Sequence, residues 1–120
     1  MTLLIADDSS LIQSNLSTLI QHAREDVEIE ISSDVESTIR TLRDQHIDIL
    51  ILDIRFPDGR GYEVLRHIDF QENRPFVMVL TNHLNEKVRE KSLKLGADLF
   101  LDKTEEYEKV VEEIVRLHHK

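Results

Sequence analysis

Short aliphatic runs alternate with amphipathic segments along the whole chain, and this pattern constrains the fold most strongly. The runs at 2–6, 47–52 and 76–80 are almost entirely apolar, which is typical of strands buried on both faces of a parallel sheet. Residues 27–31 alternate apolar and acidic side chains, as a half-exposed edge strand does, and 99–101 is a last short apolar run. The sequence therefore predicts five strands.

Segments with helical spacing separate these runs. Their apolar positions are Ile12, Leu16, Leu19, Ile20 and Ala23, then Val35, Ile39 and Leu42, then Tyr62, Leu65 and Ile68, then Leu84, Val88 and Leu95, and finally Tyr107, Val110, Val111, Ile114 and Val115. Gly96 is expected to end the fourth helix. Strict alternation of strand and helix predicts an α/β fold: a doubly wound, three-layer sandwich around a parallel five-stranded sheet of order 2-1-3-4-5, with right-handed crossovers.

Length and composition narrow the class of protein. The 120 residues suit one domain spanning 1–120, and a net charge of −9 argues against nucleic acid as a partner. No polybasic patch for a membrane surface, no basic flank of a signal peptide and no run of roughly 18 apolar residues is present. The absence of Cys excludes disulfides and thiolate chemistry and fits the cytoplasm. We expect an acidic cytoplasmic domain with no membrane contact.

Polar side chains follow four of the predicted strands. Asp7 and Asp8 follow the first strand, Asp53 the third, Thr81 the fourth and Lys103 the fifth. In a sheet of the predicted order these strand ends are consecutive neighbours, and ligands bind at that edge. Close carboxylates repel one another by about 4 kcal/mol per pair at an effective dielectric constant of about 20, and a divalent cation relieves that repulsion. A few hard oxygen ligands with room for water and phosphate favour Mg²⁺.

This set of groups is suited to phosphoryl transfer. A metal, an ammonium and a hydroxyl around one carboxylate can stabilise the oxygens of a phosphoryl group in flight. Aspartate is an acceptor in aspartyl-phosphate chemistry, and Asp53 would be the nucleophile.

Each residue alone also has a plainer interpretation. The first acidic pair is typical of caps for the helix that follows, and Asp53 could lead into the turn at 57–59. Thr81 could cap the fourth helix, and Lys103 could be an ordinary surface lysine. Their joint occurrence at successive strand ends, in this order, favours the functional interpretation.

The chain resembles the receiver domain of two-component response regulators over its whole length, and in particular the single-domain, chemotaxis-regulator-like type. The segments that carry the likeness are LLIADDS (3–9), ILILDIRFPDGRGYEVL (49–65), VMVLTN (77–82) and GADLFLDK (96–103). The resemblance implies a flavodoxin-like (βα)5 fold. It also implies a signalling protein rather than an enzyme, a phosphoacceptor with Mg²⁺-dependent self-phosphorylation and autodephosphorylation.

The resemblance implies a role for each residue at the strand ends. Asp53 takes a phosphoryl group from the phosphohistidine of a sensor histidine kinase or a histidine phosphotransfer protein. Lys103 pairs with the phosphoryl oxygens, and Thr81 moves to bond them. Phe100 is the switch aromatic that turns inward with Thr81. The implied Mg²⁺ site has direct ligands from two carboxylates and a backbone carbonyl, with a further carboxylate acting through water: Asp8, Asp53, Arg55 and Asp7.

Several positions depart from the family pattern. Thr104 stands where a proline is common after the lysine, so the geometry of the Lys103–Thr104 peptide is open. Asn82 stands where small residues are common and would crowd the approach to the phosphate. Arg55 and His83 lie where family side chains affect the lifetime of the phosphate, although His83 could equally face solvent.

The resemblance places the output surface on the fourth helix, the fifth strand and the fifth helix, where a downstream protein would bind. The fourth helix is basic and the fifth acidic, which suits either a solvated face or a charge-complementary contact, so we expect a monomer or a phosphorylation-dependent dimer.

One alternative is a pseudo-receiver that binds partners without cycling phosphate. Another is a small phosphohydrolase of the haloacid-dehalogenase type, whose second Asp is replaced here by Arg55.

Overall fold

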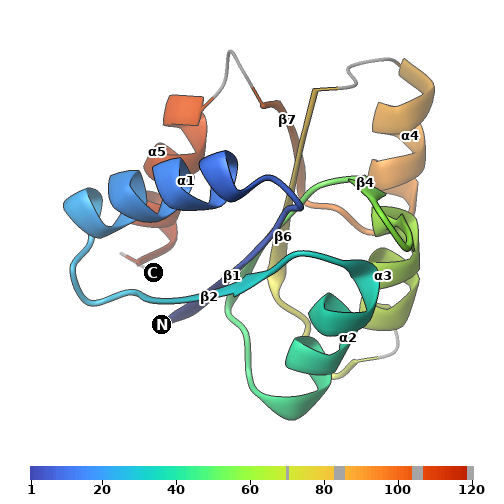
Figure 1. The fold of residues 1–120 in the computed structure, drawn as a ribbon, viewed down its shortest axis with the longest axis horizontal. Helices are drawn as coiled ribbons and strands as arrows, with labels where there is room; N and C mark the ends of the chain where they lie inside the picture. The colour runs from blue at the N-terminus through green and yellow to red at the C-terminus, as the bar shows by residue number, and fades with distance from the viewer. Residues whose placement is uncertain (70, 83–85, 104–106, 119–120) are drawn as a thin grey trace.

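The computed structural model describes residues 1–69, 71–82, 86–103 and 107–118. Its main sheet has five parallel strands in the order β2-β1-β3-β6-β7, which confirms the predicted doubly wound topology (Figure 1). The strands are β1 (Thr2–Ala6), β2 (Glu28–Ser32), β3 (Ile49–Leu52), β6 (Phe76–Thr81) and β7 (Leu99–Asp102).

Helices cover both faces of the sheet, and this confirms the three-layer sandwich. They are α1 (Ser10–Ala23), α2 (Val35–Asp44), α3 (Gly61–Ile68), α4 (Glu86–Lys94) and α5 (Tyr107–His118). Figure 1 shows α1 and α5 on one face and α2, α3 and α4 on the other. Leu84, which the helical spacing assigned to the fourth helix, lies outside the described residues.

Two buried clusters form the core, one on each face of the sheet. The sheet contributes Leu3, Ile5, Ile49, Ile51, Met78 and Leu80 to the cluster under α1 and α5, and Leu4, Ala6, Leu50, Leu52, Val77 and Val79 to the cluster under α2, α3 and α4. Because successive strand residues point to opposite faces, a strand covered on both sides must be apolar throughout. This explains the continuous aliphatic runs of β1, β3 and β6.

The alternation in β2 has the complementary explanation. This strand lies at the edge of the sheet, beside β1 alone. Ile31 is 46% exposed, and Glu28 and Glu30 do not contribute to either buried cluster. The prediction of a half-exposed edge strand is confirmed.

A short hairpin follows β3 that the sequence analysis did not predict. Strand β4 (Arg55–Phe56) pairs antiparallel with β5 (Gly59–Arg60), and Pro57 and Asp58 form the turn between them. Phe56 is buried against the α2–α4 side of the sheet, so the hairpin is anchored to the core. We refer to residues 55–60 as the β4–β5 hairpin.

The predicted end of α4 is confirmed. Gly96 has a φ of +109°, in the left-handed region, and its amide donates to the carbonyl of Leu93. A glycine adopts this conformation without the steric penalty of a side chain. Among the helices that the structure describes, none is long and apolar enough to cross a membrane.

Gly61 opens α3 in close contact with the end of β3. A Cβ atom at this position would lie 2.3 Å from the carbonyl oxygen of Asp53 and 3.2 Å from the Cα atom of Ile54. Since both neighbours are backbone, we expect Gly61→Ala to lower the free energy of unfolding by about 1–3 kcal/mol, measured by urea denaturation. The control is Arg66→Ala, at an exposed position of the same helix. Equal losses in the two variants would contradict the steric argument.

Candidate functional site

The hydrogen bonds of the sheet continue past the ends of its strands. The amide of Asp53 donates to the carbonyl of Ala6 at 3.0 Å, and the amide of Lys103 donates to the carbonyl of Thr81 at 3.0 Å. The polar residues that follow the strands therefore emerge at the same level. This is the physical reason that they share one edge of the sheet.

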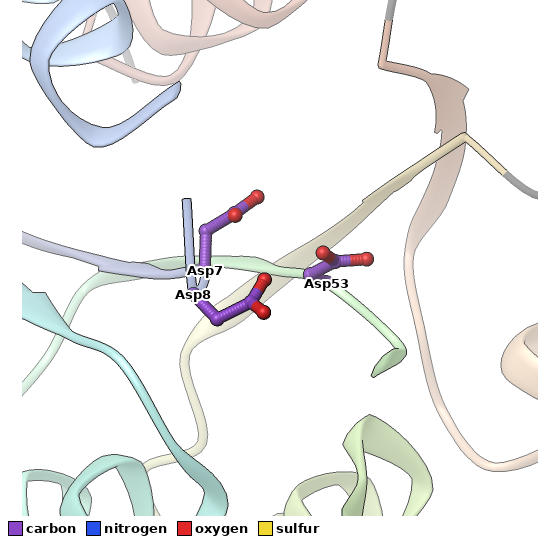
Figure 2. Close-up of side chains that lie close together, drawn as sticks. All are labelled: Asp7, Asp8 and Asp53. Atoms are coloured by element: carbon purple, nitrogen blue, oxygen red, sulfur yellow. The ribbon is translucent and has the colours of Figure 1, made fainter. Parts of the chain in front are cut away.

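Three carboxylates converge at this edge. Asp7 and Asp8, which follow β1, and Asp53, which follows β3, each offer an oxygen within 4.8 Å of the other two (Figure 2). Asp7 is 3% exposed and Asp53 7% exposed, whereas Asp8 is exposed. We call these residues the acidic cluster. A set of oxygen ligands with one open side can hold a divalent cation and leave room for water or phosphate.

Lys103 joins two of the carboxylates. Its Nζ atom lies 2.6 Å from Oδ2 of Asp7 and 2.9 Å from Oδ2 of Asp53, and the residue is only 5% exposed. Burial by itself would lower the pKa of the lysine, but the hydrogen bonds to Asp53 and Asp7 outweigh it and raise the pKa above its usual value. Lys103 is therefore a buried cation that partly neutralises the acidic cluster.

At Asp7, in contrast, the effect of burial on the pKa outweighs that of the hydrogen bonds. Burial raises its pKa, and the charge of Asp53 raises it further; the Lys103 ammonium and the amide of Ser9, which donates to Oδ1 at 2.8 Å, do not fully compensate. Ionisation of this carboxyl group therefore costs more free energy in the folded protein than in water. A bound cation would remove part of that cost.

The Asp53 side chain is oriented by two donors. Its Oδ1 atom accepts a hydrogen bond from the amide of Ile54 at 2.7 Å, and its Oδ2 atom accepts one from Lys103. Thr81, the last residue of β6, is fully buried. Its backbone carbonyl accepts a hydrogen bond from the amide of Lys103, which places Thr81 at the same edge of the sheet. The carboxylate is therefore held at the sheet edge in a defined orientation.

One residue near the site was missed by the sequence analysis. The side-chain amide of Gln13, on α1, donates to the backbone carbonyl of Asp7 at 2.6 Å and to the hydroxyl of Ser33 at 3.0 Å. It thereby ties α1 to the loops after β1 and β2. A polar residue beside Ile12 and Leu16 on the inner side of the helix was the available signal.

The remaining predicted site residues lie around this edge. Arg55 is the first residue of the β4–β5 hairpin and Asn82 follows β6; both are exposed. Phe100, on β7, is half-buried against the cluster under α2, α3 and α4. His83 and Thr104 lie outside the described residues, so the roles suggested for them stay predictions.

The buried cation makes Lys103 important for stability. We expect Lys103→Met, in the presence of EDTA at neutral pH, to lower the free energy of unfolding by about 3 kcal/mol, because it leaves Asp7 and Asp53 buried without a partner charge. Urea denaturation measures the loss. Lys94→Met removes an exposed lysine of α4 and is the matched control. A loss no larger than that of the control would show that the ion pairs contribute nothing net.

The raised pKa of Asp7 predicts a pH dependence. The folded state binds a proton at this carboxyl group more tightly than the unfolded chain does, so stability falls as pH rises through the raised pKa. In EDTA, we expect Asp7→Asn to be more stable than the wild type at neutral pH, with the difference shrinking below the usual pKa of Asp. Thermal denaturation across pH measures it, and Asp69→Asn is an exposed control. A difference that is independent of pH would contradict this explanation.

Comparison with known proteins agrees with this geometry. The family described as response regulator receiver domain matches residues 3–115. A protein-glutamate methylesterase/protein-glutamine glutaminase 2 of Nitratidesulfovibrio vulgaris is 32% identical over 120 residues, which cover 98% of this chain and 32% of that protein. The chain thus spans about a third of the length of this relative.

Solved structures share the fold. The signal receiver domain of a DNA binding response regulator from Colwellia psychrerythraea superposes with a TM-score of 0.92 at 17% identity, covering 100% of this chain and 99% of that one. A response regulator protein from Burkholderia pseudomallei, with a phosphorylated aspartic acid, calcium ion and citrate, has a TM-score of 0.79 at 16% identity, covering 98% and 72%. The family match takes in nearly the whole chain and the acidic cluster with it, and so the chain belongs to the response regulator receiver domain family.

Proposed function

We propose that this chain accepts a phosphoryl group on Asp53 from the phosphohistidine of a sensor histidine kinase or a histidine phosphotransfer protein, in a Mg²⁺-dependent reaction. The observation that carries the proposal is the buried Asp53 carboxylate, oriented at the sheet edge between Lys103 and the other members of the acidic cluster. We expect the exchange to take place in the cytoplasm.

The transfer needs one nucleophile and one leaving group. A carboxylate oxygen of Asp53 forms a bond to phosphorus while the N–P bond of the donor breaks; the electron pair stays on the leaving ring nitrogen, which takes a proton from solvent. Lys103 carries the charge to hold the phosphoryl oxygens, and Thr81 supplies a hydroxyl. Hydrolysis reverses the state when water attacks phosphorus, the O–P bond to Asp53 breaks and inorganic phosphate leaves.

The residues present fit a Mg²⁺ ion. When bound, the ion neutralises charge on the carboxylates and on the phosphoryl oxygens. We assign Asp8, Asp53 and the carbonyl of Arg55 as direct ligands and Asp7 as a ligand through water. Asp8 is exposed, which leaves its oxygens accessible to a cation, whereas Asp7 and Asp53 each have one oxygen held by Lys103. The structure of the Burkholderia pseudomallei protein contains a calcium ion and a phosphorylated aspartic acid, which supports the expectation that this fold can combine a divalent cation with a phosphoaspartate.

Phosphorylation would act on the surface formed by α4, β7 and α5. Thr81 and Phe100 lie on the neighbouring strands β6 and β7, so a movement of one toward the phosphoryl group can be followed by the other. A shift of a few kcal/mol is enough to change the populations of two states substantially. The phosphorylated form would then bind a downstream protein, form a dimer or pass the phosphate on.

Mass spectrometry of the intact protein after incubation with acetyl phosphate tests the proposal. We expect one phosphoryl group on the wild type when Mg²⁺ is present, and none in EDTA or on Asp53→Asn, because the proposal assigns the nucleophilic oxygen to Asp53 and the neutralisation of charge around it to the cation. Asp69→Asn, at an exposed carboxylate, should be labelled like the wild type.

Other outcomes identify the rival functions. No adduct on a folded wild type, under conditions that label a known receiver, would overturn the proposal in favour of a phosphorylation-independent interaction module. Repeated turnover of an aryl phosphate would instead indicate a hydrolase.

A further inference from the structure

Asp58 connects the β4–β5 hairpin to a helix far away in the sequence. Its Oδ1 atom accepts a hydrogen bond from the amide of Val35 at 2.8 Å, and its Oδ2 atom accepts one from the amide of Glu36 at 3.1 Å. Val35 and Glu36 are the first two residues of α2. Both oxygens of the carboxylate are thus used to cap a helix that precedes it by more than twenty residues.

The cap is shared between a local and a distant carboxylate. Asp34, the N-cap residue of α2, accepts from the amide of Ser37 at 2.7 Å, which leaves the first two amides to Asp58. The first amides of a helix have no partner within the helix, and a negative charge there is stabilised by the helix dipole. The attachment of the hairpin to α2 is therefore a pair of charge-assisted hydrogen bonds.

Asp58 lies in the turn of the hairpin, whereas the other contacts that hold the hairpin to the rest of the protein, among the described residues, lie at its base and in its first strand. At its base, the amide of Gly61 donates to the carbonyl of Ile54 at 2.7 Å, and in its first strand Phe56 is buried in the core. Pro57 and Asp58, in the turn, are exposed. The contact with α2 thus restrains the turn, and with it the strand that begins with Arg55.

We propose that Asp58 is a positioning residue for the cation site. By holding the hairpin against α2 it places the carbonyl of Arg55 within reach of a cation bound by Asp8 and Asp53. Asp58 itself lies outside the acidic cluster, so its effect is geometric. The inference rests on the proposed function, because it assumes the cation ligand assigned above to Arg55.

The matched pair Asp58→Ala and Asp34→Ala tests the inference on the full chain. Each substitution removes a carboxylate cap from the first turn of α2, but only the first releases the hairpin. Titration with Mn²⁺, followed by the electron paramagnetic resonance signal of the free ion, gives the affinity without a phosphoryl donor. We expect binding about tenfold weaker in Asp58→Ala, which is the scale of the loss when a group that orients a metal ligand is removed, and unchanged in Asp34→Ala.

A kinetic readout separates positioning from general destabilisation. In Asp58→Ala the Mg²⁺ concentration that gives half the maximal rate of labelling by acetyl phosphate should rise, while the rate at saturating Mg²⁺ stays near that of the wild type. Asp58→Asn, which keeps one acceptor oxygen, should lie between the two. If circular dichroism shows that Asp58→Ala does not fold, Asp58→Asn is the variant measured.

The outcomes distinguish this inference from the proposed function. Wild-type affinity in Asp58→Ala, with a wild type that binds Mn²⁺ and is labelled at Asp53, would overturn the inference alone. Equal weakening in Asp34→Ala would also overturn it, because fraying of α2 would then explain the loss. A wild type that binds no Mn²⁺, or binds it equally well after Asp8→Asn, would overturn both.

Discussion

The buried ammonium of Lys103 holds together the part of the molecule on which its chemistry depends. Lys103 follows β7, and its Nζ atom contacts Asp7, which follows β1, and Asp53, which follows β3. The ammonium therefore links the ends of three strands of the sheet. Removing two carboxylates from water is costly, and one ammonium compensates it only in part, as the raised pKa of Asp7 indicates. Replacing buried ion pairs with apolar groups of the same shape is often neutral or stabilising, so the short contacts of Lys103 are not by themselves a gain in stability.

The free-energy cost of burying these carboxylates makes the stability of the site sensitive to cation binding. A ligand that binds the folded state stabilises it according to its affinity, and a cation between carboxylates gains most where they are held close by the rest of the fold. The sheet hydrogen bonds that continue from Ala6 to Asp53 and from Thr81 to Lys103 prevent the charged groups from moving apart. Electrostatic repulsion at the site is thus maintained by the stability of the two buried clusters below it.

Most of this arrangement could be predicted from sequence because it follows from burial. Strands covered on both faces are apolar along their length, and their order places the residues that follow them at one edge. The contacts of Gln13 and Asp58 were missed because they join segments distant in sequence and leave no periodic signal. The β4–β5 hairpin was missed because its strands, of two residues each, are too short to show a period. Nor could the sequence show that Lys103 binds Asp7 as closely as Asp53, since that depends on side-chain positions within the folded edge.

The two kinds of cation ligand differ in how firmly the fold holds them. The carboxylates follow strands that are hydrogen-bonded on both sides or buried, so their spacing changes little without disrupting the sheet. Among the described residues, the hairpin that begins with Arg55 is held by the pairing of its two short strands, one buried side chain, a few hydrogen bonds at its base and the Asp58 contact with α2. Substitution in the hairpin or at the start of α2 can therefore tune cation affinity while every carboxylate of the acidic cluster is retained. Control of the site thus extends to the α2 side of the molecule, away from the α4–β7–α5 surface proposed for output.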